Sequence, residues 1–117
     1  LVRVSSDREG STTTYEFSGR QRSGCHLEID VIAPRQLEEI EIQLPNFTQV
    51  PERARRAVNR RLPNFEPSYV EESRRPQANG GFAVFYEIEG TSKGQGYEAT
   101  VDANGTSVEV ERLDEGS

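Results

Sequence analysis

The chain has 117 residues, of which 32% are hydrophobic and 29% charged, and its formal net charge is −6. This length is typical of one domain, and the low apolar content predicts a small core drawn from alternating positions. The negative charge argues against a nucleic-acid partner, because affinity for the phosphate backbone depends on Lys and Arg. No segment approaches the roughly 20 consecutive apolar residues of a transmembrane helix, so no membrane span is expected here.

The first 45 residues predict four β-strands, near residues 2–5, 12–19, 25–32 and 37–44. Leu27, Ile29 and Val31 alternate with polar neighbours, as in a strand with one buried face. The turn at 33–36 contains a proline that fixes φ near −65°. This half of the chain therefore reads as consecutive antiparallel strands.

The middle of the chain predicts one helix, from Pro51 to about Leu62. Proline is suited to the first helical position, where its missing N–H is not needed, and Pro63 ends the helix. The apolar residues of this segment fall on one side of a helix: Val50, Ala54, Ala57, Val58 and Leu62. Four more strands follow, near 66–74, 82–90, 95–102 and 107–113, and Asn104-Gly105 predicts a two-residue hairpin turn.

Short patterns recur in the same order about 70 residues apart. Residues 15–19 (YEFSG) return as 86–90 (YEIEG), and residues 39–41 (EIE) return as 109–111 (EVE). Such spacing predicts a tandem repeat of a helix-plus-four-strand unit. Repeat one covers 1–45 without its helix, and repeat two covers 46–117.

The predicted fold is therefore α+β, a single domain over 1–117 with an antiparallel sheet of about eight strands and the helix on one face. Residues 1–45 contribute no helix, so their apolar sheet face is expected to be half-covered and available for association, including a homodimer. The expected inward residues are Leu27, Ile29, Val31, Ile40, Ile42, Ala54, Val58, Leu62, Val84, Tyr86, Ile88, Tyr97, Val101 and Val110. Phe82 shares the inward phase of its strand.

The outward face of the sheet is rich in carboxylates. A solvated face explains this, since outward residues of antiparallel strands are ordinarily polar. Alternatively, the density of like charge predicts docking of a basic protein surface or a cation, with Phe85 as an exposed aromatic anchor. The residues expected at such a contact are Phe85, Glu87, Glu98, Asp102, Glu109 and Glu111.

The basic helix offers a second charged surface. Arg53, Arg56 and Arg60 lie along one flank. They could bind an anion or an acidic partner, or pair locally as part of a solvated helix face.

No catalytic residue, metal site or cofactor is predicted. The one Cys and the one His are adjacent, Cys25 and His26, and neighbours on a strand point to opposite faces. They therefore cannot form a nucleophile–base pair with each other, and one Cys with one His is too few for a conventional zinc site in a monomer. Residues 102–105 look like the start of an EF-hand calcium loop. Such a loop needs an acidic residue at its twelfth position, and that position is Leu113 here. We do not expect an enzyme.

Three segments of the chain carry a resemblance to a known family. Residues 50–65 (VPERARRAVNRRLPNF), with the strands 86–90 (YEIEG) and 97–106 (YEATVDANGT), resemble the PepSY-like family. The resemblance implies a β-lactamase-inhibitor-protein fold, with helices on one face of an antiparallel sheet, and export to the periplasm or secretion. It carries no catalytic residues and implies inhibition of a secreted peptidase as one role.

The sequence thus predicts a non-catalytic extracytoplasmic protein-binding module, an inhibitor or a sensor, that contacts an unknown partner through its acidic sheet face. Two alternatives stay open. One is a carrier domain for a small ligand or cation that uses the same carboxylates. The other is a self-assembling structural module.

Overall fold

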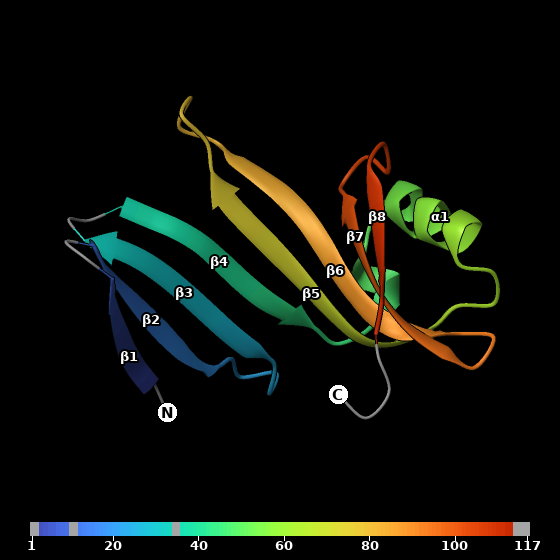
Figure 1. Cartoon of the computed structure of the whole chain (residues 1–117), viewed down its shortest axis with the longest axis horizontal. Coiled ribbons are helices and arrows are strands. Elements are labelled where there is room, and N and C mark those ends of the chain that lie inside the picture. The colour runs from blue at the N-terminus through green and yellow to red at the C-terminus, as the bar shows by residue number, and fades with distance from the viewer. Residues whose placement is uncertain (1–2, 10–11, 34–35, 114–117) are drawn as a thin grey trace. The chain divides into compact units, whose positions relative to one another are not determined.

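The computed structural model describes residues 3–9, 12–33 and 36–113. They form an eight-stranded antiparallel sheet in sequential order, with one α-helix between the fourth and fifth strands (Figure 1). The strands are β1 (Arg3–Glu9), β2 (Thr12–Arg20), β3 (His26–Ala33), β4 (Gln36–Leu44), β5 (Glu66–Pro76), β6 (Phe82–Ser92), β7 (Gln95–Asp102) and β8 (Val108–Arg112). The predicted eight-stranded sheet and its single helix are confirmed. Within the described residues, no helix is long and apolar enough to cross a membrane.

The chain divides into two compact units. Unit 1 consists of residues 1–43 and 73–83, and unit 2 of residues 44–72 and 84–117. Unit 1 contains β1, β2, β3 and most of β4. Unit 2 contains α1 (Glu52–Arg61), β7, β8 and most of β6.

A short 3₁₀ turn, η1 (Phe47–Gln49), leads into α1 and was not predicted. The Asn46 side chain caps this turn by accepting a hydrogen bond from the backbone N–H of Thr48 at 3.0 Å. Pro51 stands immediately before the helix, one position earlier than expected. The end agrees with prediction, since the helix stops at Arg61 and Leu62 follows with a non-helical backbone.

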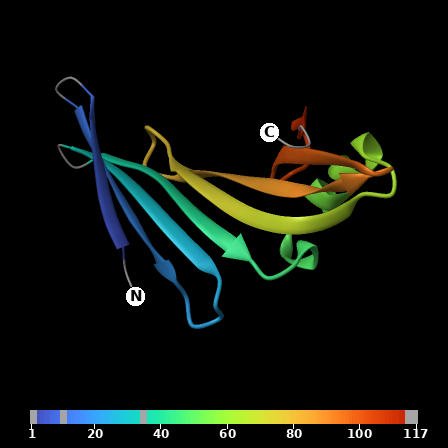
Figure 2. The ribbon, with the colours of Figure 1, turned by 60° about the horizontal axis from the view of Figure 1, so that its bottom comes forward.

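The core of the molecule lies in unit 2, where α1 packs on β7 and β8 (Figures 1 and 2). Three residues of the predicted apolar side, Ala54, Ala57 and Val58, are buried along the helix. Each large aliphatic side chain buried in this way stabilises the fold by about 1.5–3 kcal/mol. The buried hydrophobic residues of this core are Val50, Ala54, Ala57, Val58, Leu62, Phe65, Val70, Tyr86, Ile88, Ala99 and Val101.

The inward residues predicted for unit 1 do not form a comparable core. Leu27, Ile29, Val31, Ile40 and Ile42 are only half-buried. This agrees with the expectation that the apolar sheet face of residues 1–45 is only half-covered, because full burial needs an opposing layer such as a helix.

Phe82 is not packed inward as predicted. It has the inward phase of its strand, yet it is 47% exposed. It is the first residue of β6, directly after the loop 77–81, where the sheet ends. Three other predicted inward residues of β6, β7 and β8, Val84, Tyr97 and Val110, are half-buried and pack against the core of unit 2.

The β2–β3 hairpin of unit 1 and the β6–β7 hairpin of unit 2 have equivalent registers. In unit 1 Tyr15 pairs with Val31 and Phe17 with Ile29. In unit 2 the corresponding pairs are Tyr86 with Val101 and Ile88 with Ala99. The β6 residues lie 71 positions after their counterparts on β2, and the β7 residues lie 70 positions after theirs on β3. The same side-chain positions therefore share a face in both hairpins.

The turn between β7 and β8 differs from the predicted two-residue hairpin. It spans residues 103–106 and is closed by a hydrogen bond from the Asp102 N–H to the Ser107 carbonyl at 3.2 Å. Gly105 has a positive φ of 72°. Asn104 does not have a positive φ, since the described non-glycine residues that do are Asn64 and Lys93. A Cβ at Gly105 would lie 2.4 Å from the Arg53 carbonyl oxygen, so this turn approaches the helix backbone closely.

Candidate functional site: the acidic sheet face

The strands β6, β7 and β8 bring carboxylates together in rows across the outward face of unit 2. Glu98 of β7 lies directly opposite Glu89 of β6 and Glu111 of β8. One row further along, Thr100 separates Glu87 from Glu109. We refer to these five glutamates, Glu87, Glu89, Glu98, Glu109 and Glu111, as the acidic face of unit 2.

The middle row concentrates like charge around its central residue. Partial burial raises the pKa of Glu98 most, and repulsion from Glu89, Glu111 and Glu71 raises it further. Like charges directly opposite one another across strands destabilise a sheet. A cationic group placed over this row would relieve that repulsion.

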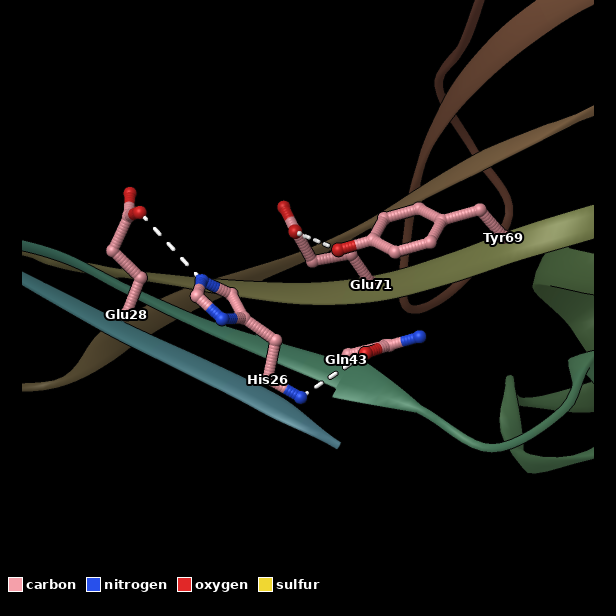
Figure 3. A network of polar contacts seen from close by, with 5 residues as sticks. All are labelled: His26, Glu28, Gln43, Tyr69 and Glu71. Atoms are coloured by element: carbon pink, nitrogen blue, oxygen red, sulfur yellow. Dashed lines mark hydrogen bonds and ion pairs between the residues drawn. The ribbon is translucent and has the colours of Figure 1, made fainter. Parts of the chain in front are cut away.

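Glu71 is a neighbour of this row that the sequence analysis missed. It is 8% exposed, and one of its carboxylate oxygens accepts a hydrogen bond from the Tyr69 hydroxyl at 2.9 Å (Figure 3). The available signal was the i, i+2 spacing of Tyr69 and Glu71, which places both on one face of a strand.

Phe85 and Asp102, both predicted contact residues, lie opposite each other on β6 and β7. Phe85 is half-buried rather than fully exposed. On β6 it is two residues before Glu87, so it stands at one end of the acidic face of unit 2. The structure thus places all six predicted contact residues on the three adjacent strands β6, β7 and β8.

The Asp102 side chain makes hydrogen bonds to the turn that follows it. Its carboxylate accepts hydrogen bonds from the N–H groups of Thr106 at 2.7 Å and Ser107 at 3.1 Å, and from the Thr106 hydroxyl. The bond from the Thr106 side chain is the largest cause that lowers the pKa of Asp102, followed by the bond from the Ser107 N–H. This side chain organises the hairpin, and the glutamates carry the accessible charge.

Unit 1 has a second group of carboxylates. Oxygens of Glu16, Glu28 and Asp30 lie within 4.8 Å of one another on β2 and β3. Burial is the largest cause that raises the pKa of Glu28 and of Asp30, and repulsion from Glu16 is the next. One oxygen of Asp30, Oδ1, is fully buried and has no hydrogen-bond partner.

His26 borders this group. Its Nε2 lies 3.8 Å from an oxygen of Glu28, and its backbone N–H donates to the Gln43 side chain at 3.0 Å (Figure 3). Cys25, its neighbour, is buried and free of any disulfide.

A buried link in unit 1 was also missed. The Ser73 hydroxyl donates to Glu39 at 2.5 Å, and Arg75 Nε lies 3.3 Å from the same carboxylate oxygen. Burial alone would raise the pKa of Glu39, but hydrogen bonds involving Glu41, Ser73 and Arg75 outweigh it and hold that pKa below its usual value. Ser73 and Arg75 are more than 30 residues from Glu39 in sequence, so a local sequence pattern could not reveal these contacts.

Three arginines of α1 make polar contacts, two of them within the helix and the residues before it and one with β8. Arg56 pairs with Glu52 at 2.6 Å, one turn earlier on the helix. Arg55 donates to the Val50 carbonyl at 2.9 Å, and Arg61 donates to the Val108 carbonyl at 3.2 Å. Of the three flank arginines, Arg56 shows the local pairing that was one of the two interpretations of the basic helix.

Comparison with solved structures shows the fold class. The chain is similar to a BLIP-like protein from Bacteroides fragilis NCTC 9343, with a TM-score of 0.68 and 13% sequence identity, over 97% of this chain and 77% of that one. At this identity the likeness shows a BLIP-like fold and nothing further. Neither a protein-family model nor a curated protein sequence matches the chain.

Proposed function

We propose that the protein is a non-catalytic, extracytoplasmic protein-binding module of the PepSY-like family, an inhibitor or a sensor, that docks a basic partner surface on the acidic face of unit 2. The observation that carries the proposal is the row in which Glu98 lies between Glu89 and Glu111. Three carboxylates held side by side repel one another in the free protein, and this repulsion would be exchanged for attraction in a complex with Lys or Arg side chains.

The position of Phe85 supports a protein partner over a simple ion. Binding energy in protein interfaces concentrates on aromatic anchors surrounded by polar residues. Phe85 stands at the end of the acidic face of unit 2 with part of its side chain accessible. Docking there would bury an aromatic side chain beside charges that steer a basic partner into register.

The BLIP-like fold and the chemistry of the chain support the same class of function. Its one Cys is buried and its one His lies beside a carboxylate, so neither of these described residues is placed as half of a Cys–His nucleophile–base pair. The proposed periplasmic or secreted location follows from the family resemblance.

A charge-reversal experiment tests the proposal. The parent protein is used to capture partners from the extracytoplasmic fraction of the source organism, beside the variant Glu98→Lys, Glu109→Lys, Glu111→Lys. A matched control, Glu38→Lys, Glu52→Lys, Glu66→Lys, makes the same change of net charge at exposed positions away from this face. The proposal expects a partner that the parent and the control capture and the first variant loses, with binding that weakens as salt rises.

Two results would contradict the proposal. A partner retained by the first variant would move the contact away from the acidic face of unit 2. No partner, together with a calcium-dependent rise in melting temperature, would support the carrier alternative instead.

A further inference from the structure

A cavity of about 340 Å³ lies in unit 1, at the turn end of the β2–β3 hairpin. It is lined by Arg3 of β1, by Ser18, Gly19 and Arg20 of β2, and by His26 of β3. None of these described lining residues is acidic, although the net charge of the protein is −6. Two arginines without a carboxylate in the same cavity make a local positive field that attracts an anion.

The strand register brings the polar side chains of this cavity to one face of the sheet. Arg3 lies directly opposite Ser18, and Arg20 lies directly opposite His26. Ser18 and Arg20 are two residues apart on β2, so their side chains share a face. Four polar side chains from three strands therefore line one space, as in ligand sites where a few polar groups fix the orientation of the ligand.

Both arginines of the cavity have donors available for a ligand. Arg20 donates from Nη1 to the Gly24 carbonyl at 2.8 Å, which holds its side chain against the hairpin turn. The Arg3 guanidinium has no hydrogen-bond or ion-pair partner among the residues that the structure describes. A guanidinium carries five N–H donors, so most donors of the two groups are unused.

His26 is held in place from two sides. Its backbone N–H donates to the Gln43 side chain at 3.0 Å, and its Nε2 lies 3.8 Å from an oxygen of Glu28 (Figure 3). Glu28 thus takes up Nε2, which leaves Nδ1 as the ring nitrogen for a ligand. The same carboxylate repels any anion that enters the cavity, so its removal is expected to strengthen anion binding.

A phosphate group fits these donors better than a carboxylate does. A carboxylate is planar, and one guanidinium can satisfy both of its oxygens in a bidentate pair. A phosphate monoester has three acceptor oxygens and a charge of about −1.5 to −2 at pH 7, so it can engage two guanidinium groups and a hydroxyl together. The volume of about 340 Å³ lies near the lower end of the roughly 300–1,000 Å³ of small-molecule sites, which leaves room for the group that carries the phosphate.

We propose that this cavity of unit 1 binds a phosphate group, either on a small organic molecule or as free inorganic phosphate. Arg3 and Arg20 supply the charged contacts, and Ser18 and His26 supply further hydrogen bonds. The site uses no residue of the acidic face of unit 2, and it selects an anion where that face selects a cation. The two proposals therefore stand or fall independently.

A titration of the intact ¹⁵N-labelled protein tests the site by nuclear magnetic resonance. The probes are inorganic phosphate and O-phosphoserine at pH 7, with sodium acetate at matched ionic strength as the control. Both phosphate probes should shift the amide resonances of the cavity residues, and acetate should bind at least tenfold more weakly. Tighter binding of O-phosphoserine would assign the phosphate to a small organic molecule, and equal binding would assign it to the free ion.

Neighbouring arginines give a matched pair of variants. Arg20→Gln should weaken phosphate binding at least tenfold. Arg22→Gln makes the same change of charge at an exposed position in the adjoining turn, outside the cavity lining, and should leave binding within twofold. Arg3→Gln should also weaken binding at least tenfold, and it serves as a second variant because Arg20 has an additional role in the turn. Circular dichroism verifies that each variant is folded.

Glu28→Gln provides a test with the opposite sign. It removes the carboxylate beside His26 and keeps a side-chain acceptor for the ring, so it should tighten phosphate binding at least twofold.

Three results would overturn the inference. The first is no phosphate-dependent shift at the cavity residues at tens of millimolar phosphate. The second is acetate binding as tight as phosphate binding, which would assign the cavity to a carboxylate such as an acidic side chain of another polypeptide. The third is equal weakening by Arg20→Gln and Arg22→Gln, which would reduce the effect to general attraction between charges.

Discussion

The β2–β3 hairpin of unit 1 and the β6–β7 hairpin of unit 2 pair in the same register yet differ in burial. Phe17 is 38% exposed, while Ile88, at the corresponding position, is 0% exposed. Alternation of apolar and polar residues fixes the register and decides which side chains share a face. Burial needs a second layer, and in unit 2 that layer is α1.

The comparison has its largest consequence for stability at this pair of positions. Ile88→Ala should lower the free energy of unfolding by about 2–5 kcal/mol, because it removes methyl groups from a closed core and leaves a cavity. Phe17→Ala should cost clearly less, although it deletes more atoms, since part of the side chain is already in water. Urea unfolding of both variants measures the difference. Equal losses would show that the two faces are equally covered in solution.

A glycine of unit 2 provides the next largest effect. A Cβ at Gly90 would lie 2.3 Å from the Glu66 carbonyl oxygen and 2.7 Å from the Phe65 ring. Gly90→Ala should therefore destabilise the protein by about 1–3 kcal/mol through overpacking. Gly96→Ala is the control, because the nearest atom to its Cβ would be Leu113 Cβ at 3.5 Å, an ordinary contact. If thermal unfolding finds the two variants alike, the segment before β5 does not pack on β6 as described.

Asp102 tests the turn that lies against the helix. Asp102→Ala should cost about 1 kcal/mol at pH 7, because two backbone N–H groups and the Thr106 hydroxyl lose their acceptor. The pKa of this carboxyl is lowered in the folded protein, so its contribution is present above the ordinary value of 3.8 and is lost as the pH falls through the folded value. Unfolding followed from pH 7 to pH 2 should show the parent and the variant converging at the acidic end. A constant gap would mean that the carboxylate charge is not what the turn uses.

The pH dependence of Glu98 should have the opposite sign. Its pKa is raised, so between the ordinary value of 4.5 and the folded value the native state binds more protons than the unfolded chain, and stability falls as the pH rises through that window. Glu98→Gln should thus stabilise the protein at pH 7 by up to about 1 kcal/mol, the range for cross-strand pairs. Its advantage should vanish at acidic pH, where Glu98 is already neutral. Denaturant unfolding at pH 4 and pH 7 measures this, and destabilisation at pH 7 would remove the basis for calling the row repulsive.

How far the sequence could anticipate these results depends on the range of the interaction. The strands and α1 were predicted within a few residues, because alternation and helical periodicity are local. The half-burial of Ile29 was expected because repeat one has no helix, although alternation alone does not specify which layer covers a sheet. The bond from Ser73 to Glu39 joins residues 34 positions apart, which only the folded sheet brings together. Asp102 was interpreted by its charge, although an aspartate four residues before Thr106 is also typical of a side-chain-capped turn.

The smallest effect concerns the solvent side of α1. Arg56 and Glu52 form a close pair at 2.6 Å, but their side chains are 67% and 64% exposed. Exposed pairs of this spacing stabilise a helix by only about 0.3–0.5 kcal/mol, and salt screens them. Arg56→Ala should therefore change the free energy of unfolding by less than about 0.5 kcal/mol, with the change shrinking further in 1 M NaCl. A larger loss that survives high salt would mean that Arg56 contributes more to stability than an exposed pair within the helix.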